Sequence, residues 1–170
     1  MNLQSLNKMN YGMYIISSRN NDYSKINAFL GNTCFQLTAS PINIAVSINK
    51  ENLTGDFIEK SNVFTISIIT ESADMKFIGH FGFRNGRDFD KFSPEIYKYK
   101  LGDNGSPIIL DNTNAYIEVN VKNKIDVGTH QLFIGEVSES DILNDEISMT
   151  YKFYHEVLKG KTPKKAATYI

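Results

Sequence analysis

The sequence predicts a mainly β fold, an antiparallel barrel with a few short helices. Segments rich in β-branched and aromatic residues, which are typical of strands, lie at 11–17, 42–48, 63–69, 115–121 and 131–137. In the second and third of these, apolar residues alternate with small or hydroxylated ones, so one face packs while the other could hold a ligand. The connections are not uniformly long enough for helical crossovers, and 102–107 and 126–129 are typical of turns. Closure into an antiparallel barrel follows.

Two helices and one ambiguous segment complete the predicted elements. Residues 52–60 and 72–81 carry apolar side chains at helical spacing. Ser72 is the predicted N-cap of the second helix, because a serine hydroxyl accepts hydrogen bonds from the first N–H groups of a helix. Residues 149–159 show helical spacing but begin like a strand, so both alternatives stay open.

Length and composition favour one domain, residues 1–158, followed by a basic, weakly structured tail at 159–170. The chain has 170 residues, 41% of them hydrophobic, which suits a single core. Its net charge of −1 counts against nucleic acid as a partner. The single cysteine, Cys34, fits a reducing compartment. Because the start lacks a signal-peptide pattern and no run reaches 18 apolar residues, we expect a cytoplasmic protein without a membrane partner.

The motifs of several enzyme classes are missing from the sequence. The cysteine and the three histidines are far apart, so no metal site is predicted, and GxSxG, P-loop and GxGxxG patterns do not occur. What remains is a run of small polar residues at 31–41, followed after the next strand by 49–54. Backbone N–H groups, hydroxyls and a lysine in these segments can bind a phosphate. The alternative is a polar strand end and an ordinary helix cap.

Two further segments carry candidate ligand-binding residues. His130 begins a predicted strand and is either a hydrogen-bond or proton donor for a ligand or an ordinary hydrogen-bonding residue. Residues 80–92 mix aromatic and cationic side chains, which can form a wall and a guanidinium for a planar anion. Phe89 and Phe92 in this segment are the expected core anchors.

Five stretches of the chain, at 11–16, 32–41, 49–54, 88–92 and 128–137, together resemble the flavin reductase-like family of FMN-binding split barrels. The most similar branch contains flavoredoxins and the flavin modules of NADH:rubredoxin oxidoreductases. The last stretch is close to the family pattern Gly-Asp-His-x-Leu-Phe-x-Gly-x-Val. The resemblance implies a six-stranded antiparallel Greek-key split barrel, a homodimer, and FMN near the subunit interface that accepts hydride from NADH or NADPH.

The resemblance also implies roles for individual residues. The residues implied at the flavin ring and ribityl chain are Asn32, Thr33, Cys34 and Phe35. Those implied on the phosphate side are Asn49, Lys50, Thr54 and Arg87. A second flavin-contacting stretch comprises His80, Phe81 and Gly82. His130 is the implied catalytic residue, on the redox-active side of the ring.

Three functions remain open at this point. An NAD(P)H-dependent flavin reductase would pass electrons to free flavin or to a small redox protein such as rubredoxin. The second alternative is a carrier with tightly bound FMN, because Asn32-Thr33-Cys34 and Ser40-Pro41-Ile42 depart from the Ser-rich and paired-proline pattern of many free-flavin reductases. The segment 154–170 is similar to the linker that precedes a rubredoxin domain in fused relatives. A non-redox barrel, such as an oligonucleotide-binding one, is the third alternative.

Overall fold

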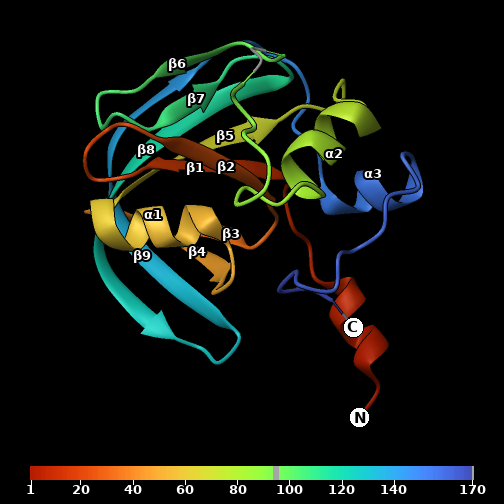
Figure 1. Ribbon diagram of the computed structural model, residues 1–170. Coiled ribbons are helices and arrows are strands. Elements are labelled where there is room, and N and C mark those ends of the chain that lie inside the picture. Colours follow the sequence, from red (N-terminus) through yellow and green to blue (C-terminus); the bar gives the residue numbers. More distant parts are fainter. Residues whose placement is uncertain (94–95, 170) are drawn as a thin grey trace.

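The computed structural model describes residues 1–93 and 96–169, and strands dominate it (Figure 1). Its main sheet contains β1 (Tyr14–Arg19), β2 (Ile26–Gly31), β3 (Cys34–Ala39), β4 (Ile42–Asn49), β5 (Val63–Ile69), β8 (Thr113–Asp126) and β9 (His130–Ile142). A separate hairpin pairs β6 (Tyr99–Leu101) with β7 (Pro107–Ile109). The helices are the 3-10 helix η1 (Leu3–Lys8) and the α-helices α1 (Leu53–Ser61), α2 (Met75–Gly82) and α3 (Tyr151–Glu156).

The main sheet closes through the junction of β2 and β3. Its antiparallel strands follow the order β2-β1-β5-β8-β9-β4-β3, so β2 and β3 lie at opposite ends of the sheet. In the chain these two strands are separated only by Asn32 and Thr33, and the Ser47 N–H continues the pairing by donating to the Thr33 carbonyl (3.0 Å). Counted as one bent strand, β2 and β3 close a six-stranded barrel. The predicted split-barrel fold class is confirmed.

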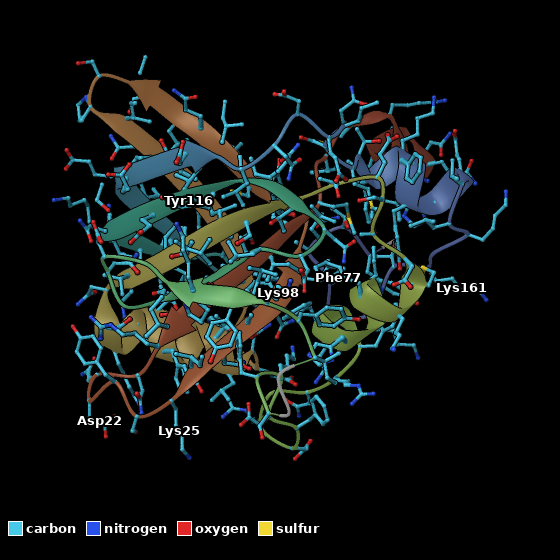
Figure 2. All side chains as sticks on the ribbon, turned by 90° about the horizontal axis from the view of Figure 1, so that it is seen from above. Asp22, Lys25, Phe77, Lys98, Tyr116 and Lys161 are labelled. Carbon is cyan, nitrogen blue, oxygen red and sulfur yellow. The ribbon has the colours of Figure 1, made fainter. Side chains whose placement is uncertain are left out.

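The core has two parts, and strands β1 and β5 contribute residues to both of them. The alternating residues Ile44, Val46 and Ile48 of β4 pack with β5, β8, β9 and α1 in one cluster. The second cluster joins α2 and α3 to the sheet, and Phe77 of α2 points inward toward it (Figure 2). Phe92 packs against this second cluster, as predicted. None of the helices in the described residues has the length and apolarity needed to cross a membrane.

The expectation that the hydroxylated face of 63–69 could hold a ligand is wrong. Thr65 and Ser67 on this face of β5 are fully buried. The hairpin of β6 and β7 covers them, and the Ile109 N–H donates to the Ser67 hydroxyl (3.0 Å). The β6–β7 hairpin, which is distant in sequence from β5, therefore covers the face that was expected to hold a ligand.

The predicted start of the second helix is wrong, whereas the first helix is confirmed. Residues 52–60 do form α1, but α2 begins at Met75, and its N-cap is Asp74, whose carboxylate accepts from the Phe77 N–H (2.8 Å). The predicted cap, Ser72, instead donates to the Glu146 carboxylate (2.5 Å). Both alternatives for 149–159 occur, because the Met149 N–H donates to the Ile69 carbonyl of β5 (2.7 Å) and α3 then begins at residue 151.

Candidate ligand-binding site

A cavity of about 750 Å³ opens beside the bend between β2 and β3. Its walls come from that bend, the end of β4 with the start of α1, the end of α2 with the loop after it, the start of β9, and the C-terminal segment. Its volume is within the range of small-molecule and cofactor sites, roughly 300–1,000 Å³. The predicted site residues that it brings together are Asn32, Thr33, Asn49, Lys50, Phe81, Gly82, Arg87 and His130.

Four other predicted residues do not line the cavity. Phe35 is exposed on β3, and Thr54 is buried in α1, where its hydroxyl accepts from the Asn27 amide (3.0 Å). Cys34 packs against the core cluster that contains Ile44, Val46 and Ile48 of β4. Burial raises the pKa of its thiol to about 12. A thiol with this pKa stays protonated at neutral pH and is a poor nucleophile.

His80 is the fourth residue, and it points into the core. Its imidazole is buried, Nε2 hydrogen-bonds with the Lys91 carbonyl (2.8 Å), and the ring packs edge-on against Phe81, Phe89 and Tyr97. Burial lowers the pKa of His80, so the neutral ring donates from Nε2 to the carbonyl. The histidine therefore supports the loop after α2 and does not face the cavity.

The cavity is strongly cationic although the chain as a whole is nearly neutral. Its cationic lining residues are Lys50, Arg84, Arg87, Lys91, Lys164 and Lys165. Glu51 is the only carboxylate among the lining residues in the described part of the chain. A concentration of one charge sign in a concave site attracts ligands of the opposite sign. The site is therefore suited to an anion.

Three of these cations pair with carboxylates, and two of the three, Lys50 and Arg87, lie outside the C-terminal segment. Lys50 pairs with Asp126 and Arg87 with Asp56, each at 2.6 Å. All four side chains are at least one-third exposed, and exposed ion pairs contribute about 1 kcal/mol or less. An anionic ligand can therefore replace either carboxylate as the partner of the cation, at a small cost in free energy.

Lys91 differs from the other cations because its ammonium is buried. The side chain is 5% exposed, and Nζ donates to the carbonyls of Ala28 (2.7 Å) and Phe81 (2.8 Å). Removal from water lowers the pKa of Lys91 to about 8. Sequence reasoning missed this residue, since a lysine between Asp90 and Phe92 in a polar segment carries no sign that it points inward.

His130 lines the cavity, and its implied role at the flavin stays a prediction. It is half-buried at the start of β9, where it pairs with Asn49 of β4, and its Nδ1 lies 2.9 Å from the Thr129 hydroxyl. Among the residues that the structure describes, Nε2 has no hydrogen-bond partner. A ligand in the cavity can therefore reach this nitrogen.

The C-terminal segment forms a wall of the cavity, which the expectation of a weakly structured tail did not include. Residues 163–167 line the cavity. The Asn32 amide donates to the Thr168 hydroxyl (2.8 Å), and the Asn49 amide donates to the Lys165 carbonyl (3.2 Å). Two predicted site residues are thus bound to the tail.

The fold and the cavity define an antiparallel split barrel with a cavity lined by cations, and comparisons with known proteins identify its family. The flavin reductase-like domain model matches residues 6–160. A high molecular weight rubredoxin of Moorella thermoacetica is 42% identical over 99% of this chain and 72% of its own. A ferric-chelate reductase (NAD(P)H) of Archaeoglobus fulgidus is 40% identical over 100% and 98%. The NADH:FAD oxidoreductase structure of Streptomyces globisporus has the same fold, with a TM-score of 0.76, 18% identity, and coverage of 86% and 84%.

The chain belongs to the flavin reductase-like domain family. It is a flavin reductase-like oxidoreductase, a class that works with a flavin and a reduced nicotinamide nucleotide. The resemblance, the reaction class and the cofactors predicted from the sequence are confirmed at this level.

Proposed function

We propose that the protein binds FMN in this cavity, takes hydride from NADH or NADPH, and passes electrons to free flavin or to a small redox protein such as rubredoxin. The charge of the cavity carries the assignment of the site, with six Lys and Arg against one Glu in a chain of net charge −1. Beside these cations lies an apolar wall that includes Phe29, Leu30 and Phe81. Cations next to an apolar wall fit a phosphate ester of a large ring.

The residues of the chain position the reactants, while a bound flavin supplies the hydride chemistry. Lys50 and Arg87 are the proposed phosphate partners, because each is exposed and pairs with a carboxylate that a phosphate can replace. Asn32 and Thr33 would bind the ring edge and ribityl chain from the bend between β2 and β3. His130 would orient the nicotinamide or hold a proton at Nε2.

The phosphate assignment predicts a difference between FMN and riboflavin. Arg87→Ala is expected to weaken FMN binding about 10-fold, because a charge-assisted hydrogen bond is lost, and to leave riboflavin binding nearly unchanged. Quenching of flavin fluorescence in equilibrium titrations measures both affinities. Lys152→Ala, which breaks an exposed pair on α3, is the matched control. If neither flavin binds at micromolar concentration, the proposed function is wrong.

The electron acceptor is the part of the function on which the relatives differ. One is named a rubredoxin and the other a ferric-chelate reductase, so a ferric chelate is a third candidate acceptor. Reoxidation of the NADH-reduced protein by rubredoxin, ferric citrate and free FMN, followed separately under anaerobic conditions, ranks the three. Failure of NADH to reduce the bound flavin would favour the carrier without NAD(P)H activity. We place this reaction in the cytoplasm, which the single cysteine supports.

We also propose that the protein is a homodimer joined through the hairpin of β3 and β4. Every residue from 35 to 42 is exposed, and Phe35, Leu37 and Ile42 are 50%, 44% and 46% exposed. Clustered exposed apolar side chains are typical of an interface. We expect sedimentation velocity to show a dimer and Leu37→Lys to shift it to monomers. A monomeric parent protein would contradict this assignment.

A further inference from the structure

The C-terminal strap, defined here as residues 159–169, is fixed firmly at its first residues. The Gly160 N–H donates to the Tyr154 carbonyl (2.9 Å), and the Tyr154 hydroxyl donates to the Lys161 carbonyl (3.0 Å). The Tyr154 ring packs so closely on Gly160 that a Cβ there would lie 2.0 Å from the ring carbon Cζ. His155 Nδ1 also hydrogen-bonds with the Gly160 carbonyl (2.8 Å). The strap therefore leaves α3 in a defined direction, with the Lys161 side chain extending into solvent (Figure 2).

The far part of the strap is held across the cavity by a few weaker contacts. Besides the bonds from Asn32 to Thr168 and from Asn49 to Lys165, an ion pair joins Lys165 to Glu51. Both charged side chains are about 70% exposed, so this pair contributes little. A segment with a rigid base and a weakly held end can open and close again without unfolding the barrel.

The strap is a wall of the cavity and leaves its interior open. The volume of about 750 Å³ remains with the strap in place, and residues 163–167 are part of its lining. The strap also brings Lys164 and Lys165 to the cavity, two of its six cations. A flavin bound there would be covered on this side by the strap.

The strap lies outside the part of the chain that defines the family. The family model ends at residue 160, whereas the two relatives that are 42% and 40% identical match 99% and 100% of the chain. We propose residues 1–158, the barrel, as the folding domain. Most residues that line the cavity belong to it. The strap is an addition that this chain shares with its more similar relatives.

We propose that the C-terminal strap retains the flavin, so that FMN stays bound between turnovers as a cofactor and does not exchange as a substrate. The inference rests on the proposed function, because it assumes that the cavity holds FMN. It concerns the rate at which FMN leaves, a quantity independent of NADH oxidation.

Deletion of residues 162–170 tests the inference while keeping the base at Gly160 and Lys161. We expect FMN to leave the truncated protein at least about 10-fold faster, because the deletion removes the wall that the strap forms together with its hydrogen bonds to Asn32 and Asn49 and its ion pair with Glu51. Stopped-flow fluorescence, with an excess of an unrelated apoflavodoxin to capture released FMN, measures this rate. Lys152→Ala on α3 is the control and should release FMN at the parent rate.

The point variant Thr168→Val provides a second test if the truncated protein does not fold. It removes the hydroxyl that accepts from Asn32 and donates to the Tyr151 hydroxyl (3.4 Å), and we expect release about 3-fold faster. An unchanged release rate in the truncated protein, or in Thr168→Val where truncation prevents folding, would overturn the strap inference and leave the proposed function standing. If the full-length protein binds no FMN at all, the proposed function fails and the strap inference fails with it.

Discussion

Replacement of His130 by alanine is expected to slow the reduction of bound FMN by NADH about 100-fold. This factor is the lower end of what a positioned acid–base or hydrogen-bonding side chain contributes. We expect FMN affinity to change little, because the proposed phosphate contacts come from other residues. Anaerobic single-turnover bleaching of the flavin absorbance measures the rate, and an unchanged rate would eliminate the role.

The structure places His130 at the cavity and His80 in the core. His130 is placed by the pairing of β9 with β4, and the Lys50 N–H, which donates to the Thr129 carbonyl (3.1 Å), ties the preceding turn to the cavity. Thr129 engages Nδ1 and leaves Nε2 for a ligand. His130→Gln keeps a hydrogen-bond donor but cannot shuttle a proton. Recovery of most of the rate in this variant would assign positioning, whereas continued slow reduction would assign proton transfer.

Lys91 is expected to make the protein more stable as the pH rises from about 8 to 10.5, by roughly 3 kcal/mol over the full interval. Its pKa is about 8 in the folded protein against an ordinary value of 10.5. Between these values the unfolded chain binds more protons than the folded one, so the free energy of unfolding increases with pH. The neutral amine retains two N–H groups, which is sufficient for the carbonyls of Ala28 and Phe81.

Comparison with Lys91→Met isolates this contribution. Urea unfolding of both proteins at pH values of about 7.5, 9 and 10.5 gives the free energy of unfolding at each. The parent protein should gain stability relative to Lys91→Met across the series. Tyrosines whose pKa burial raises, such as Tyr14 and Tyr154, occur in both proteins, so their effect cancels in the difference. Parallel curves would show that the Lys91 ammonium is not held in a low-dielectric site.

Strands with a regular pattern were predictable, and strands without one were not. β4 and β5 carry alternating apolar residues, and they were placed to within one residue of their observed ends. β3 is exposed at nearly every position, so its polar sequence contains no alternation to detect. It is extended because β4 pairs with it, and β2 because β1 pairs with it, and such partners are distant from any local window.

The candidate site was predictable as a set of segments but only partly as side chains. The stretches at 32–41, 49–54 and 128–137 all contribute to the cavity, in accord with their resemblance to the family. Within them, direction depends on packing: Cys34 turns to the core and Phe35 to solvent, while Asn32 and Thr33 at the bend face the cavity. A residue at a bend between strands can change face with a small rotation of the backbone, which residue type alone does not reveal.

Periodicity and composition were sufficient for a mainly β fold, and the family motifs were sufficient for the split barrel and the reaction class, because these signals are contained in short stretches of sequence. Only the tertiary structure shows that the Lys91 side chain is buried and that the strap crosses the cavity. Both depend on contacts between residues far apart in sequence: Lys91 meets Ala28, and Thr168 meets Asn32. The inward direction of a cation and the course of a polar tail follow from where carbonyls and amides lie after the sheet has closed, and no local pattern in the chain encodes them.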